Sequence, residues 1–281
     1  MKPLLLLLFA CALIGAPRQG ILRCPVSSGA QRYGQAGDVV TFRPSGRADR
    51  PGFFDVQVAG RWLDAVGGYC ILPLDPEIVP PRVFLLLHQP PPVIEADRQN
   101  LIALSKAVLK LFPGHRLSEG ILARLPELIA GEPDGKSVPQ EAVALAREYL
   151  RKYPSGPDRD RLEWLICRWL NSWYEYEGVA VGPASEAKAY EAFLRDHPGS
   201  SVIDDVKLRL AMVSRIAAEC VFHGEHEGFS SADGQRFEAR ARELYQSLAR
   251  SPDPVTRETA RLALTNMSRG RTAYTCCGFD R

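Results

Sequence analysis

One short stretch decides the fold of this chain: Leu194-Arg195-Asp196-His197-Pro198. The same leucine-to-proline pattern, next to helical spacing of apolar residues, occurs three more times, at residues 109–113, 150–154 and 248–252. Successive prolines lie 41, 44 and 54 residues apart. Self-similarity at such a period is typical of stacked helical hairpins, in which proline ends one helix and fits the opening turn of the next segment.

The segments around these prolines have the apolar period of amphipathic helices. We therefore expect helical-hairpin repeats over residues 95–270, with apolar stripes at 101–111, 121–129, 143–153, 162–173, 189–194, 208–216, 237–248 and 260–264. Ser201, with Asp204 three residues on, is expected to begin a helix in the manner of a capping box. Because no single hairpin can bury its own stripe, neighbouring hairpins are expected to stack.

Residues 21–89 differ in kind and predict a small β-rich domain, either a sandwich or a barrel. Short runs of β-branched and aromatic residues, bounded by glycine and proline, lie at 37–42, 53–58, 61–66, 69–72 and 82–87. Ala59-Gly60 fits a tight hairpin turn between two of them. Prolines 90 to 92 predict a stiff linker over 90–94. The fold class is therefore mainly α, a hairpin-repeat solenoid preceded by a β-rich domain.

The first sixteen residues predict a signal peptide. A positive start, Met1-Lys2, precedes an apolar segment that is too short to span a bilayer. Cleavage has two alternatives. Leu8-Phe9-Ala10-Cys11 resembles a lipobox, in which Cys11 would be lipidated, whereas ordinary signal peptidase would cut after Gly15 or Ala16. The protein is therefore expected to be exported, to the periplasm or outer membrane as a lipoprotein, or secreted.

The charge pattern disfavours two classes of partner. The chain carries 35 basic and 33 acidic side chains, for a net charge of +2, and no run of like charge stands out. Nucleic acid and anionic membrane surfaces are therefore poor partners, and membrane contact would come only through a lipid anchor.

Six cysteines remain after either cleavage, and in an exported chain they predict disulfides. A disulfide between Cys24 and Cys70 would crosslink the β-rich region. The other four, in the helical part and in the tail over 271–281, would then pair among themselves: Cys167, Cys220, Cys276 and Cys277. Free, buried thiols are the alternative.

The clearest resemblance to a known family lies in residues 189–201, which read Ala-Tyr-Glu-Ala-Phe-Leu-Arg-Asp-His-Pro-Gly-Ser-Ser. This line is similar to tetratricopeptide-type repeats of bacterial outer-membrane assembly lipoproteins and cell-division coordinator proteins, with weaker copies at 146–155 and 241–253. The resemblance covers residues 95–270, although the spacings exceed the roughly 34 residues of the standard repeat. It implies a tetratricopeptide-like solenoid with a binding groove and without catalytic residues or a cofactor.

Three of the four tryptophans fall within ten residues of one another. Trp169 and Trp173 lie on the predicted core stripe, whereas Trp164 points away from it. Two interpretations stay open. The aromatic residues pack hairpin against hairpin, or Trp164 lines a concave partner-binding face together with Tyr174 or Tyr176.

The best metal candidate is Cys220-x-x-His223-x-x-His226, because thiolate and imidazole groups are good zinc ligands. Cys276 or Cys277 would supply a fourth ligand. The alternative is an oxidised Cys220 beside a polar loop that joins two helices.

Two hypotheses of function follow. The first is a non-enzymatic envelope scaffold that binds a protein or peptide along the helical-repeat surface. The second is an exported metal-binding or thiol-redox protein that uses Cys220, His223 and His226.

Overall fold

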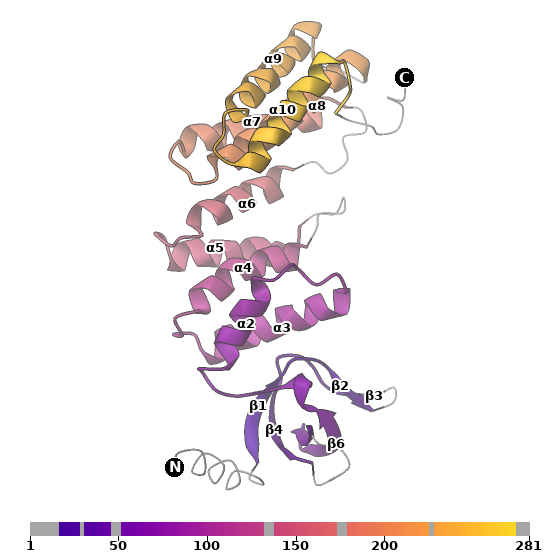
Figure 1. Cartoon of the computed structure of the whole chain (residues 1–281), viewed down its shortest axis with the longest axis vertical. Helices are drawn as coiled ribbons and strands as arrows, with labels where there is room; N and C mark the ends of the chain where they lie inside the picture. The colour runs from indigo at the N-terminus through magenta and orange to yellow at the C-terminus, as the bar shows by residue number, and fades with distance from the viewer. Residues whose placement is uncertain are drawn as a thin grey trace. The chain divides into compact units, whose positions relative to one another are not determined.

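The computed structural model describes residues 17–28, 31–45, 52–131, 138–172, 179–224 and 228–273. The chain is mainly helical, with a small antiparallel sheet near its N-terminus, as Figure 1 shows. It divides into two compact units, Met1–Gly131 and Glu132–Arg281. The predicted signal peptide with Cys11, and residues 274–281 with Cys276 and Cys277, lie outside the described residues.

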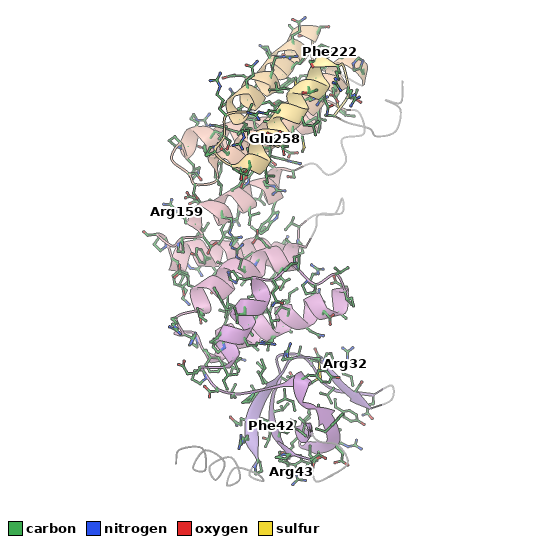
Figure 2. All side chains as sticks on the ribbon, viewed as in Figure 1. Arg32, Phe42, Arg43, Arg159, Phe222 and Glu258 are labelled. Carbon is green, nitrogen blue, oxygen red and sulfur yellow. A yellow bond between two sulfur atoms is a disulfide. The ribbon has the colours of Figure 1, made fainter. Side chains whose placement is uncertain are left out.

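A five-stranded antiparallel sheet opens the first unit, in the order β6-β5-β4-β1-β7. In that order the strands are Arg61–Gly67, Phe53–Val58, Val39–Pro44, Arg18–Leu22 and Ile71–Pro73. A separate hairpin joins β2 (Val26–Ser28) to β3 (Gln31–Gly34), and a 3-10 turn (Gly68–Cys70) precedes β7. Strands from both edges of the sheet contribute to one core, which includes Phe42 of β4 (Figure 2).

The β-rich region is confirmed, and three predicted runs coincide with β4, β5 and β6. Ala59 and Gly60 have φ values of 49° and 80°, which is the left-handed pair that a two-residue hairpin turn needs. Strand β1 was not predicted. Its residues alternate, with Leu22 in the core of the sheet and Ile21 on the opposite face against the helices.

The predicted strand over 82–87 is wrong, because these residues belong to helix α2 (Val79–Leu87). Pro80 and Pro81 follow Val79 in the first turn of α2, where their fixed φ suits a helix and the missing N–H groups cost nothing. Val79 and Val83, four residues apart and both 0% exposed, face the core. A continuous apolar run does not distinguish a buried strand from a buried helix by its period.

The boundary between the two units lies after Gly131, and not at the predicted linker. Residues 90–94 are irregular, as expected, but α3 (Glu95–Leu111) and α4 (Ser118–Ala130) share a hydrophobic cluster with the sheet. This cluster unites Ile21 of β1, Val83 of α2, Val108 of α3 and Ile121 of α4. The sheet and the first helices therefore form one unit.

Gly37 shows how closely the sheet approaches α3. Its φ is +91°, and a Cβ there would lie 2.8 Å from the backbone oxygen of Ala103. Only glycine combines this conformation with so close an approach. The turn before β4 therefore rests directly on the α3 backbone.

Six helices make up the described part of the second unit. They are α5 (Gln140–Lys152), α6 (Arg159–Asn171), α7 (Val181–Asp196), α8 (Ile203–His223), α9 (Ser231–Leu248) and α10 (Pro254–Ser268). The apolar stripes predicted from the sequence fall within helices, except that Tyr153 follows the last residue of α5 and Trp173 lies outside the described residues. One hydrophobic cluster runs from α6 to α10, and α9 packs against both α8 and α10 (Figure 1).

The predicted capping role of Ser201 is wrong. Helix α8 has Val202 at its N-cap and no side-chain cap, and the Asp204 carboxylate instead accepts a hydrogen bond from the Ser251 hydroxyl at 2.7 Å. A capping box does occur at α9. There Ser230 and Asp233 each accept a hydrogen bond from the other's backbone N–H, which satisfies two amides at the helix start.

Three of the four proline turns have the same backbone conformation. The residue before each proline ends its helix with nearly identical torsions: Phe112 (φ −128°, ψ 54°), Tyr153 (φ −129°, ψ 66°) and His197 (φ −128°, ψ 57°). Its carbonyl accepts a hydrogen bond from the N–H three residues on, at 3.1, 3.0 and 3.1 Å respectively. Proline explains this conformation, because a steric clash with its ring disfavours the α region for the preceding residue. We call this the shared turn.

The fourth proline turn departs from the shared turn. Helix α9 ends at Leu248, four residues before Pro252, and its C-cap residue Ala249 keeps helical torsions (φ −61°, ψ −7°). Asp253 then caps α10 by accepting a hydrogen bond from the Thr256 N–H at 2.6 Å. The proline is present in all four turns, but only three place it directly after the helix cap.

Candidate partner-binding site

Trp164 does not lie on an exposed binding face, which corrects the expectation from the sequence. Its side chain is only 4% exposed, and its ring lies 4.8 Å from that of Tyr190 and 5.5 Å from that of Phe193, both on α7. Helix α6 is in contact with α5 and α7, so it has two apolar faces where a single stripe was expected. Trp164 occupies the α7 face and offers no surface to a partner.

The other aromatic candidates divide into two groups. Trp169, predicted to lie in the core, is half-buried. Trp173, Tyr174 and Tyr176 lie outside the described residues, so the structure places none of them. The partner-binding role of Tyr174 and Tyr176 stays a prediction.

The metal candidate is only partly described. Cys220 is 0% exposed and packs among Ala180, Ile216 and Val221. His223 is the last residue of α8, and His226 lies outside the described residues. Among the residues that the structure describes, no group of three or more His, Cys, Asp or Glu side chains is placed to hold a metal ion.

The four cysteines that the structure describes separate into one disulfide and two thiols. Cys24 and Cys70 are bonded, as predicted, across a sequence separation of 46. Cys167 and Cys220 carry free thiols, which corrects the expectation that they pair. They belong to different hydrophobic clusters, and burial raises the pKa of each thiol to about 11. Both are neutral near pH 7, which disfavours thiolate redox chemistry.

A buried polar network at the junction of α6, α7 and α8 was not foreseen from the sequence. Glu186 of α7 is 0% exposed, and its Oε1 accepts hydrogen bonds from Tyr190 Oη at 2.6 Å and Arg209 Nε at 3.0 Å. Ser172 Oγ lies 3.0 Å from Tyr190 Oη. Burial raises the pKa of Tyr190 far above its usual range, and the charge of Glu186 raises it further. Tyr190 therefore remains a hydrogen-bond donor to the carboxylate.

The shared turn reveals why this network is unusual. The position eleven residues before the turn's first residue is buried in all three copies, where Leu101 and Ala142 are the counterparts of Glu186. A carboxylate thus stands where the other two copies have apolar side chains. Aligning the copies on their prolines would have exposed this substitution in the sequence.

Successive turns in the second unit are joined by acidic side chains. Asp160, two residues after the N-cap of α6, accepts a hydrogen bond from the Ser201 N–H at 2.7 Å. Asp204, two residues after the N-cap of α8, accepts one from the Ser251 hydroxyl at 2.7 Å. Each carboxylate therefore reaches from one proline turn to the next and fixes how neighbouring hairpins align.

The Asp160 contact predicts a pH-dependent contribution to stability. The Ser201 N–H holds the pKa of Asp160 below its usual value, so the contact stabilises the fold above about pH 4 and is lost as the pH falls through the lowered pKa. Replacing Asp160 with Asn should reduce the free energy of unfolding by about 1–2 kcal/mol at pH 7. Urea unfolding at several pH values checks this.

The matched control is Asp196→Asn, which removes an exposed carboxylate paired only with neighbouring Arg195 in a surface contact. This change should cost less than about 0.5 kcal/mol. An Asp160→Asn effect that stayed constant from pH 7 to pH 3 would contradict the assigned role of the carboxylate.

Comparison of the chain with protein-family models, with curated proteins and with solved structures finds no match. The resemblance to tetratricopeptide-type envelope proteins therefore stays a prediction. Within the described ranges, no helix is both long enough and apolar enough to cross a membrane.

Proposed function

We propose that this chain is an exported helical-hairpin repeat scaffold that binds a protein or peptide partner through its helical surface. The observation that carries the proposal is the shared turn, because Phe112, Tyr153 and His197 have the same torsions and the same hydrogen bond that follows. Repeated turn geometry at a period of 41 and 44 residues supports a tetratricopeptide-like solenoid. Such arrays present extended surfaces that suit binding better than catalysis.

Two contacts support the stacking that a solenoid needs. Asp160 and Asp204 occupy equivalent positions after the N-caps of α6 and α8, and each bonds to the following proline turn. Each hairpin thereby aligns on its neighbour through a repeated contact, in addition to apolar packing. Nearest-neighbour contacts of this kind are the interactions that hold repeat arrays together.

Export is part of the same proposal. The Cys24–Cys70 disulfide supports an oxidising compartment, since such bonds are rare in the reducing cytosol. With the signal-peptide pattern of residues 1–16, it favours the periplasm, the outer membrane through a lipidated Cys11, or secretion.

Photo-crosslinking in the native host tests the binding role. The photoreactive analogue p-benzoylphenylalanine replaces Tyr174 or Tyr176, both of which it resembles in shape. We expect a discrete adduct at one or both positions, identified by mass spectrometry. The control places the analogue at Tyr69, which is 76% exposed in the first unit. Adducts equal at all three positions, or absent from all three, would refute partner binding at these residues.

A further inference from the structure

Helix α8 holds an ion pair that the repeat architecture does not require. Arg215 Nε lies 3.0 Å from Glu219 Oε1, one helical turn away, and the two side chains are only 7% and 14% exposed. Tyr245 of α9 is buried within electrostatic reach of both charges. A pair this buried is costly to desolvate unless its remaining hydrogen-bonding capacity is also used.

That remaining capacity is taken up by the backbone of residues 271–273. Arg215 Nη2 donates to the carbonyl oxygen of Arg271. The Ala273 N–H donates to both carboxylate oxygens of Glu219, at 2.8 and 2.9 Å. The side chains of the three residues are exposed, so the segment is held through its main chain.

The chain is directed to this pair by a turn after α10. Gly270 has a φ of +68°, and the N–H groups of Gly270 and Arg271 donate to the carbonyls of Met267 and Asn266. This is a Schellman motif, in which glycine takes the left-handed position. Beyond it the segment is irregular and ends, as far as the structure describes it, at Ala273.

We propose that Arg215 and Glu219 form a peptide site that binds main-chain groups, and that residues 271–273 occupy it in place of a partner segment. The site recognises one carbonyl and the N–H two residues later, and makes no demand on side chains. Its partner would be a peptide segment with no fixed sequence, whose main chain presents these two groups. This inference builds on the proposed scaffold function and specifies one site and one class of ligand for it.

The occupant in the structure supports this partner chemistry. A carboxylate that receives a bifurcated N–H bond and a guanidinium that donates to a carbonyl are charge-assisted contacts, the stronger kind of hydrogen bond. Because residues 271–273 are tethered, they compete at a high effective concentration. A partner peptide therefore binds well only after this segment is released.

Release is achieved in the full-length chain by Ala273→Pro, which removes the N–H that bonds Glu219 and leaves the ion pair intact. Ala273→Ser is the matched control, because it keeps this N–H. The probe is a fluorescent peptide with the sequence of residues 269–274, blocked at both ends, and its Kd is measured by fluorescence anisotropy. We expect the proline variant to bind it at least tenfold more tightly than the serine variant does.

Two further measurements identify the main chain as the recognised group. The same peptide, N-methylated at its alanine, should lose about tenfold or more in affinity for the proline variant, whereas a scrambled peptide should bind within about threefold. Adding Glu219→Gln to the proline variant should lower its affinity for the unmethylated peptide by the same factor as N-methylation of the peptide does. Glu238→Gln on α9 is its control, since Glu238 sits in an exposed pair with Arg242.

Equal affinity of the proline and serine variants, or no loss on N-methylation, would overturn the peptide site. Concentration-dependent dimers of the wild-type chain that disappear in Ala273→Pro would overturn it in favour of tail exchange between two copies. Neither outcome affects the crosslinking expected at Tyr174 and Tyr176. Evidence against the peptide site is therefore distinguishable from evidence against the scaffold function.

Discussion

Replacing Arg209 with leucine should destabilise the second unit by about 3 kcal/mol at pH 7. The change removes a cation whose Nη2 lies 2.9 Å from Glu186 Oε1 and leaves a carboxylate that is 0% exposed. Breaking a buried pair from one side costs about 3–5 kcal/mol. We expect the lower end of this range because the Arg209 side chain is 26% exposed, which lets water reach part of the site. Urea unfolding, with hydrogen exchange at α7 and α8, measures the effect.

Two variants serve as controls for Arg209→Leu. Arg242→Leu breaks an exposed pair with Glu238 on α9 and should cost less than about 1 kcal/mol. The double variant Glu186→Leu/Arg209→Leu should lie within about 2 kcal/mol of the wild type, because it removes both charges together. The hydroxyls of Ser172 and Tyr190 lie 3.0 Å apart in the wild type, and we expect them to keep bonding each other in that variant.

The outcome that would contradict this account is an Arg209→Leu cost no greater than that of Arg242→Leu. Glu186 would then be held by its remaining contacts, and the cation would be dispensable. A double variant less stable than the sum of its single changes would likewise contradict it, because removing both charges should relieve part of each penalty.

Reduction of the Cys24–Cys70 disulfide should lower the free energy of unfolding of the first unit by about 4 kcal/mol. The bond closes a loop with a sequence separation of 46, and the chain-entropy relation assigns about this value to such a loop. The melting temperature of the first unit should fall by roughly 15 °C or more. Thermal unfolding with and without reductant measures the change.

The control is the double variant Cys24→Ala/Cys70→Ala, on which reductant should have no further effect. This variant distinguishes the effect of losing the disulfide from any effect of reductant elsewhere in the chain. Cys167 and Cys220 are already thiols, so reductant has no bond to break at either of these two described cysteines. A first unit equally stable in both conditions would show that its hydrophobic core alone holds it together.

The helices were predictable because their signal is local. An apolar stripe of period 3.6 followed by Pro113, Pro154 or Pro198 contains both the helix and the place where it ends. The eight stripes therefore lie in helices, apart from Tyr153 at the C-cap of α5 and Trp173 outside the described residues. Helix α2 was missed because the run from Val83 to Leu87 has no polar residue to reveal its period.

What the sequence did not predict depends on contacts between distant residues. The unit boundary was misplaced because Ile21 packs with α3 and α4, a contact that no local pattern encodes. The orientation of Trp164 was predicted wrongly because α6 packs against helices on two sides. Glu186 was not predicted as a buried site because it precedes the stripe over 189–194, where a single charge is typical of a solvated face. Its role becomes evident only from its contacts with Arg209 and Tyr190.

The packing of Ile21 and Ile121 into one hydrophobic cluster also sets how the first unit can fold. This contact closes roughly 100 residues of chain, and loop-closure entropy must be overcome before it contributes any stabilisation. In the second unit each helix packs mainly on its neighbour in sequence, so short loops suffice. Because folding rates fall as contacting residues lie further apart in sequence, the helical unit should reach its native state first. The unit that begins the chain is therefore the slower one to complete.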